Sequence, residues 1–155
     1  SIDARVPNRL FVEALASRWM GVGAVHVEPE ARFGDSRLDF RLTLGERLMW
    51  VEVKSVTLVR GGVAMFPDAP TTRGRRHLDA LAEAVAKGDG AAVVFIVQRS
   101  DARCFSPNGE ADPEFAQRLH EVAQAGVAVR AFRCAVTTHE ISIAHEIPAE
   151  WPICR

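Results

Sequence analysis

The sequence contains no apolar segment long enough to cross a bilayer. Its longest uninterrupted apolar run covers the seven residues 91–97, whereas a membrane-spanning helix needs about 20. The first ten residues, SIDARVPNRL, also lack the apolar segment of a signal peptide. We therefore expect a soluble, cytoplasmic protein that does not bind membranes.

Cysteine is scarce as well. Cys104, Cys134 and Cys154 are odd in number, lie far apart and form no C-x-x-C pair. This spacing indicates neither a disulfide framework nor a zinc site. We expect reduced, mostly buried thiols.

The chain also lacks an excess of charge of one sign. Its 19 lysines and arginines are balanced by 20 acidic residues, for a net charge of -1. No field of the whole protein would draw it onto nucleic acid, so any polyanion must bind locally. Lysine is the rarest charged residue: apart from Lys54 and Lys87, every basic residue is arginine.

With 155 residues, the chain has the size of one ordinary domain, and we expect a single domain over 1–155. Apolar periodicity and turn residues predict helices at 7–20, 71–87 and 112–125, and strands at 24–30, 37–44, 48–58, 91–98, 127–136 and 141–147. Thr71 or Thr72 should cap the second helix and Asp112 the third. Three strands joined by tight turns, followed by alternating helices and strands, predict an α/β fold with a mixed β-sheet flanked by α-helices.

The turn at Gly45-Glu46 fixes a register for the strands on either side. If Leu44 faces Arg47, the numbers of paired residues sum to 91, so Asp39 should lie opposite Glu52. Like charges directly opposite each other destabilise a sheet. A divalent cation between the two carboxylates would remove that cost, whereas solvated strand charges would explain the pattern equally well.

Lys54 lies two residues beyond Glu52 and is expected on the same side of the sheet. Its ammonium could orient or deprotonate a water beside a Mg²⁺ or Mn²⁺ ion held by Asp39 and Glu52. Arginine, with its planar fork, cannot replace such a compact donor. A catalytic set of Asp39, Glu52 and Lys54 is therefore the first candidate site.

Several motifs resemble the sugar fermentation stimulation protein A family. They are PNRL at 7–10, RLDF at 37–40, VEVKSVTL at 51–58, FPDA at 66–69, Thr71 with Arg73-Gly74, HL at 77–78 and VQR at 97–99. The resemblance implies a restriction-endonuclease-like domain of the PD-(D/E)XK superfamily, with Asp39 as its first acid and Glu52 and Lys54 as its E-x-K half. It also implies nucleic-acid binding and a metal-dependent nuclease. The family's N-terminal OB-like domain carries a Cys-Pro-Asn-Thr-Gly signature that nothing here matches, so we expect that domain to be missing from this chain.

A basic cluster opens the second predicted helix: Arg73, Arg75, Arg76 and His77. The free N–H groups and positive dipole of a helix start favour a phosphate, so the cluster is a candidate nucleic-acid-binding patch. A solvated basic helix start is the alternative, and His77 by itself fits an interfacial or core histidine.

Glu13, Gln98 and Asp68 are possible additional site residues. We expect Glu13 at the surface, away from the apolar stripe of its helix, while Gln98 ends the apolar strand and Asp68 lies in the FPDA loop. The sequence thus predicts a metal-dependent nuclease, with DNA favoured over RNA as its partner. The alternative is a non-catalytic DNA-binding regulatory module that takes part in the control of sugar metabolism.

Overall fold

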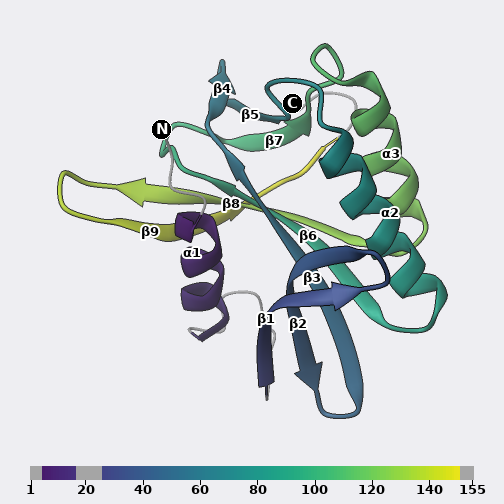
Figure 1. Cartoon of the computed structure of the whole chain (residues 1–155). Helices are drawn as coiled ribbons and strands as arrows, with labels where there is room; N and C mark the ends of the chain where they lie inside the picture. The colour runs from purple at the N-terminus through teal and green to yellow at the C-terminus, as the bar shows by residue number, and fades with distance from the viewer. Residues whose placement is uncertain (1–4, 17–25, 151–155) are drawn as a thin grey trace.

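A computed structural model describes residues 5–16 and 26–150 (Figure 1). In chain order, the elements are α1 (Arg5–Ala16), β1 (His26–Phe33), β2 (Ser36–Leu44), β3 (Arg47–Val56), β4 (Leu58–Arg60), β5 (Val63–Phe66), α2 (Thr72–Ala86), β6 (Gly90–Val97), β7 (Cys104–Pro107), α3 (Pro113–Gln124), β8 (Ala128–Val136) and β9 (Ile141–Ile147). The predicted residues 17–20 and 24–25 lie outside the described residues. In the described part, no helix is both long and apolar enough to span a membrane.

The main sheet has the strand order β1-β2-β3-β6-β8-β9. β1, β2 and β3 form an antiparallel meander, β3, β6 and β8 run parallel, and β9 returns antiparallel to β8. The predicted mixed α/β sheet is confirmed. Its parallel half follows from α2 and α3, which carry the chain back between strands that run in the same direction.

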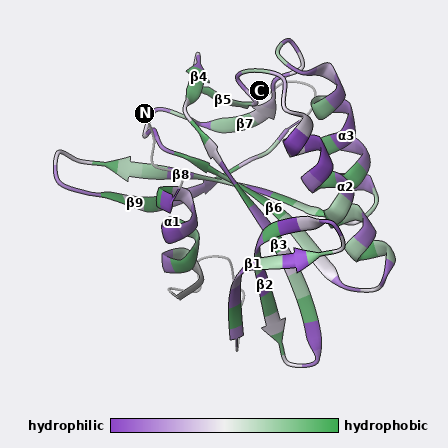
Figure 2. Cartoon of the chain, viewed as in Figure 1, coloured by the Kyte–Doolittle hydropathy of each residue, from purple (hydrophilic) through white to green (hydrophobic). Residues whose placement is uncertain are grey.

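Helices cover both faces of this sheet: α1 lies on one face, and α2 and α3 lie on the other (Figure 1). Residues of β6 alternate between the two layers, since Val93 and Phe95 pack under α2 and α3 while Val94 and Ile96 pack under α1. Figure 2 shows hydrophilic and hydrophobic residues alternating along α2 and α3, as amphipathic helices require. The continuous apolar sequence of β6 therefore reflects its burial on both faces.

Local capping fixes where α2 and α3 begin. The Thr71 side chain accepts a hydrogen bond from the amide of Gly74 at 2.9 Å, and Asp112 accepts one from the amide of Phe115 at 2.9 Å. Each side chain satisfies an amide that has no partner within the first turn of its helix. Both predicted caps are confirmed, with Thr71 in that position rather than Thr72.

A second, three-stranded sheet, ordered β4-β5-β7, was not predicted. No strand is predicted at 104–107, and the third predicted strand of the meander ends at 58. These strands are only three or four residues long, too short for apolar alternation to stand out.

The expectation of reduced thiols is wrong for Cys104, which is disulfide-bonded, whereas Cys134 is a free and buried thiol. Spacing along the chain could not show this pairing, because a disulfide depends on proximity in the fold. Cys154 lies outside the described residues.

Candidate active site

The β2–β3 hairpin has the predicted register. Its pairs run from Leu44 with Arg47 to Phe40 with Val51, and the residue numbers of every pair sum to 91. Trp50 packs in the layer under α2 and α3, while Val51 packs under α1. Glu52 and Lys54, an even number of positions beyond Trp50, are therefore directed to the α2 side of β3.

Asp39 and Glu52 follow the last pair of this ladder, and their side chains bind main-chain amides. The amide of Asp39 donates to Glu52 Oε1 at 3.1 Å, and the amide of Val53 donates to Asp39 Oδ2 at 2.8 Å. The two carboxylates thus lie together where the hydrogen-bonded ladder of β2 and β3 stops. The two side chains meet as predicted, but residues 39 and 52 are not a pair of the ladder, because carboxylate-to-amide bonds replace the ordinary pairing there.

The strands bend at this point. Leu38 packs in the layer under α2 and α3, whereas Phe40 packs under α1, so the two residues do not share a face as regular alternation along β2 would require. On the neighbouring strand, Glu30 has a φ of 51°, a left-handed conformation that is uncommon outside glycine. Backbone outliers of this kind cluster at functional sites. The bend places Asp39 at the edge of its sheet layer and within reach of α1.

Glu52, Lys54 and His77 form a compact polar triangle. Lys54 Nζ lies 2.7 Å from Glu52 Oε2 and 2.8 Å from His77 Nδ1, and His77 Nδ1 lies 2.8 Å from Glu52 Oε2. The exposed fractions of the three side chains are 4% for Glu52, 13% for Lys54 and 8% for His77. Helix α2 therefore supplies the third member of a nearly buried charge cluster whose other two members come from β3.

The chemistry of these groups limits which hydrogen bonds can form at once. A carboxylate only accepts and an ammonium only donates, whereas a ring nitrogen does one or the other according to its protonation. His77 Nδ1 can therefore accept from Lys54 or donate to Glu52, but a single protonation state cannot do both. The three contacts of the triangle are therefore not all hydrogen bonds at the same time.

The two carboxylates have opposite pKa shifts. Burial raises the pKa of Asp39 from 3.8 to about 6, and the negative charge of Glu52 adds to the increase. Burial also acts to raise the pKa of Glu52, but the hydrogen bond from His77 and the positive charge of Lys54 outweigh it and lower that pKa to about 2. At neutral pH, Glu52 is an ion-paired carboxylate, and Asp39 is a carboxylate whose charge is poorly compensated.

Asn8 on α1 is the remaining partner of Asp39. Its Nδ2 donates to Asp39 Oδ1 at 3.2 Å. In the sequence, Asn8 stands out only as part of the PNRL motif, which by itself indicates no role for it. That motif was the available signal, because no local pattern predicts that the start of α1 would reach β2.

These residues line an open cleft of about 440 Å³ between α1, the β2–β3 fork and α2. Glu30 and Arg73 also line it, together with Ser55, whose Oγ accepts a hydrogen bond from Gln98 Nε2 at 2.8 Å. Among the described residues, no group of three or more histidine, cysteine or acidic side chains is arranged to hold a metal ion. Any cation would rely on Asp39 and Glu52, and two carboxylates completed by water and substrate phosphate are a donor set that suits Mg²⁺.

The three possible additional site residues, Gln98, Asp68 and Glu13, lie outside this cleft. Gln98 reaches it only through Ser55. Asp68 is exposed and lines a small cavity of about 40 Å³ that Ser55 also lines. Glu13 is at the surface of α1, as expected, and pairs with Arg9 at 2.6 Å.

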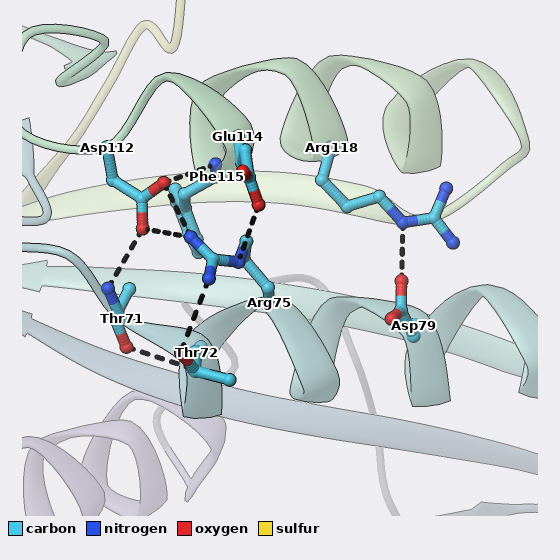
Figure 3. Close-up of polar contacts among 9 residues, drawn as sticks. Thr71, Thr72, Arg75, Asp79, Asp112, Glu114, Phe115 and Arg118 are labelled. Atoms are coloured by element: carbon cyan, nitrogen blue, oxygen red, sulfur yellow. Dashed lines mark hydrogen bonds and ion pairs between the residues drawn. The ribbon is translucent and has the colours of Figure 1, made fainter.

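Helix α2 separates the predicted basic cluster into two groups. Arg73 and His77, four residues apart on the helix, both line the cleft. Arg75 is directed to α3, where its Nη1 lies 2.8 Å from Asp112 Oδ1 and its Nε lies 3.5 Å from Glu114 Oε2 (Figure 3). The pairing with Arg75, together with hydrogen bonds from main-chain amides, lowers the pKa of Asp112 against the effect of burial. Arg75 therefore joins α2 to α3 on the side of α2 that faces away from Asp39 and Glu52.

Comparison with known proteins connects this geometry to a family. The sequence model described as "Sugar fermentation stimulation protein RE domain" matches residues 5–140. A sugar fermentation stimulation protein homolog of Moorella thermoacetica is 47% identical over 153 residues, covering 92% of this chain and 63% of that protein. A homolog of Caldanaerobacter subterraneus subsp. tengcongensis is 44% identical over 149 residues, covering 95% and 65%. The chain thus spans less than two thirds of the length of these relatives.

A solved structure has the same fold. The Pyrococcus furiosus SfsA structure, in complex with Ca²⁺, matches with a TM-score of 0.91 and 32% identity, covering 96% of this chain and 66% of the other. The predicted restriction-endonuclease-like fold is confirmed by this match and by the domain description of the family. On sequence and structure alike, the chain belongs to the sugar fermentation stimulation protein family.

Proposed function

We propose that this chain is the catalytic domain of a metal-dependent nuclease that cleaves phosphodiester bonds, with DNA favoured over RNA as substrate. One observation carries the proposal: two carboxylates with opposite pKa shifts and one nearly buried lysine converge in an open cleft. Titratable groups whose pKa values are shifted in opposite directions within one cleft are typical of catalytic sites.

Asp39 and Glu52 would hold a Mg²⁺ or Mn²⁺ ion. The chemistry of the donor set supports this assignment, because both ligands are hard carboxylate oxygens and the charge of Asp39 has little compensation in the protein alone. When bound, such an ion would supply Lewis acidity toward a phosphate oxygen and would lower the pKa of a coordinated water. The Pyrococcus furiosus relative binds a divalent cation, since its structure is a complex with Ca²⁺, and this supports the proposal for the present chain.

Lys54 would act on the attacking water. Its Nζ lies between Glu52 Oε2 and His77 Nδ1, so its direction is fixed from two sides. From this position, the ammonium can orient the water through a hydrogen bond that it donates, and once it has lost its proton the amine can accept one from the water. His77 would be a positioning residue, because its Nδ1 contacts both Lys54 Nζ and Glu52 Oε2 at 2.8 Å.

Asn8 and Arg73 would complete the site from the two helices. Asn8 holds one oxygen of Asp39 through its hydrogen bond, which leaves the carboxylate in a single orientation. Arg73 lines the cleft from α2 and adds positive charge to its wall. The strained conformation of Glu30 at the same cleft fits a site whose geometry is held by the surrounding fold.

The test is incubation of the chain with labelled single- and double-stranded DNA and RNA in Mg²⁺, Mn²⁺ or EDTA, with Asp39→Asn as the inactive control. We expect cleavage of DNA with either metal, no cleavage in EDTA and none by the variant. Binding of DNA without metal-dependent cleavage of any substrate would contradict the enzyme and favour the DNA-binding regulatory module. The same set of substrates measures the preference for DNA over RNA.

A further inference from the structure

A second hollow adjoins the catalytic cleft. It has a volume of about 250 Å³ and is lined by Asp35, Ser36 and Arg37 at the start of β2 and by Arg73, Arg76 and His77 of α2. Arg73 and His77 line both this hollow and the cleft. The two spaces therefore meet at the same turn of α2. We call this second space the arginine hollow.

The three arginines of the hollow carry uncompensated charge. Within the described part of the chain, Arg37, Arg73 and Arg76 form no ion pair and no side-chain hydrogen bond. On the opposite side of the same helix, by contrast, Arg75 pairs with Asp112, and Asp79 pairs with Arg118 (Figure 3). The unpaired arginines of α2 are thus those that face the hollow, and the paired one faces α3.

The carboxylate that lines the hollow, Asp35, is exposed at the β1–β2 turn and forms no ion pair with these arginines. Three guanidinium groups against one carboxylate leave a local excess of positive charge in a chain whose net charge is -1. Like charges held together repel each other unless an anion joins them. Guanidinium groups bind phosphate oxygens through paired hydrogen bonds, so a phosphate is the anion that matches them best.

We infer that the arginine hollow binds a single phosphate group of a nucleic acid, next to the phosphate that is cleaved between Asp39 and Glu52. This inference rests on the proposed function and adds a second contact point for the substrate. The proposed phosphate site includes Arg37, which is not part of the basic cluster predicted at the start of the helix, and it excludes Arg75. The volume is below the roughly 300–1,000 Å³ of pockets that enclose whole small molecules, which favours a phosphate over a nucleoside.

The number of phosphates can be measured from the salt dependence of binding. Each phosphate that a protein neutralises contributes about 0.9 to the slope of log K against log salt for duplex DNA, and about 0.7 for a single strand. If three arginines share one phosphate, removing all three lowers the magnitude of the slope by about one contact. A general basic surface would lose about one contact for each arginine.

The experiment measures binding of a labelled 12-nucleotide DNA by fluorescence anisotropy in EDTA, from 50 to 300 mM NaCl. Arg37→Gln should weaken binding roughly tenfold or more, the size of one lost charge-assisted contact. The triple variant Arg37→Gln, Arg73→Gln, Arg76→Gln should reduce the slope by about one contact in total. The matched control is Arg47→Gln, which removes an exposed, unpaired arginine at the far end of β3 and should leave both affinity and slope as in the wild type.

Two sources of the phosphate are separated by comparing oligonucleotides with a 5′-phosphate and a 5′-hydroxyl. If the hollow binds a terminal phosphate, the phosphorylated strand binds more tightly and Arg37→Gln removes that advantage. If it binds an internal phosphodiester, the two strands bind alike and Arg37→Gln weakens both. Either result supports a phosphate site.

An unchanged slope in the triple variant, or a loss of about three contacts, would overturn the single-phosphate site. Neither result bears on cleavage by the wild type, which the incubations in Mg²⁺ and Mn²⁺ measure separately. If the wild type binds no DNA at any salt concentration, the proposed function and this inference fail together. If DNA binds with the expected slope change but is not cleaved in Mg²⁺ or Mn²⁺, the result contradicts the proposed nuclease activity and supports the phosphate site.

Discussion

Asp39 and Glu52 join β2 and β3 through each other's main chain. The amide of Asp39 donates to Glu52 Oε1 at 3.1 Å, while Asp39 Oδ2 accepts from the amide that follows Glu52, at 2.8 Å. Glu52 has Lys54 and His77 as additional partners, whereas Asp39 has the neutral amide of Asn8. The partners of Glu52 lower its pKa to about 2, whereas burial and the nearby charge of Glu52 raise the pKa of Asp39 to about 6.

The raised pKa of Asp39 predicts a loss of stability as the pH rises. The folded-state pKa of about 6 lies above the ordinary 3.8. The contribution of Asp39 to the stability of the fold is therefore fully present below about pH 4 and is lost as the pH rises past 6. Between pH 4 and 7.5, the free energy of unfolding of the wild type should fall by roughly 1 to 3 kcal/mol more than that of Asp39→Asn. Urea unfolding at the two pH values measures the difference.

Glu46→Gln is the control for this comparison, because Glu46 is exposed at the β2–β3 turn. Its stability should depend on pH as that of the wild type does. An identical pH dependence in Asp39→Asn and the wild type would show that the carboxylate at position 39 is not destabilised in the fold.

A divalent cation should offset the destabilisation that the ionised carboxylate of Asp39 causes. At a concentration 100 times its dissociation constant, Mg²⁺ or Mn²⁺ should stabilise the wild type by about 2.7 kcal/mol, and it should stabilise Asp39→Asn much less. Thermal melts in EDTA and in each metal measure this. If neither metal changes the wild-type melting temperature, even with a non-cleavable oligonucleotide present, then Asp39 and Glu52 do not form a metal site.

Lys54→Arg should abolish cleavage while DNA binding is kept. The substituted side chain keeps the charge, but a planar guanidinium cannot reproduce the compact contacts of Nζ with Glu52 and His77 at 2.7 and 2.8 Å. We expect the cleavage rate to fall by about 10²- to 10⁴-fold, the usual contribution of a group that transfers a proton. Single-turnover cleavage and anisotropy separate the two effects.

The other lysine of the chain offers the matched control. Lys87 is exposed and pairs with Glu83 one turn earlier on α2, at 3.4 Å. Lys87→Arg should cleave at the wild-type rate. Equal rates in Lys54→Arg and the wild type would make Lys54 a structural charge.

Arg75→Gln should change stability rather than nucleic-acid binding. Asp112 is buried and would lose Arg75 Nη1, which donates to both of its oxygens, although it keeps the amides of Thr71 and Phe115. We expect a loss of about 1 to 3 kcal/mol in the free energy of unfolding. The salt slope for DNA should stay at the wild-type value, and a reduction by one contact would instead place Arg75 in the nucleic-acid interface.

Local sequence signals predicted much of this fold. The turn at Gly45-Glu46 set the β2–β3 register, and with it the meeting of Asp39 and Glu52, because a two-residue hairpin leaves only one way to pair the flanking residues. Thr71 and Asp112 marked the starts of α2 and α3 because a cap acts on amides within three residues of itself. The all-apolar strand β6 was recognised because burial on both faces leaves no alternation.

The tertiary structure decided which side chains surround that pair. Asn8 and His77 reach Asp39 and Glu52 across 31 and 25 positions of the chain, and Arg37 meets Arg73 and Arg76 from another element. No periodic pattern carries such information, because it depends on how α1 and α2 pack against the sheet. Among the basic residues of α2, the sequence alone could not separate Arg75 from its neighbours, since the difference lies in Asp112, which α3 brings to Arg75 after the helices have packed. The placement of Asp39, Glu52 and Lys54 therefore follows from short-range geometry, whereas their partners and the arginine hollow depend on long-range packing.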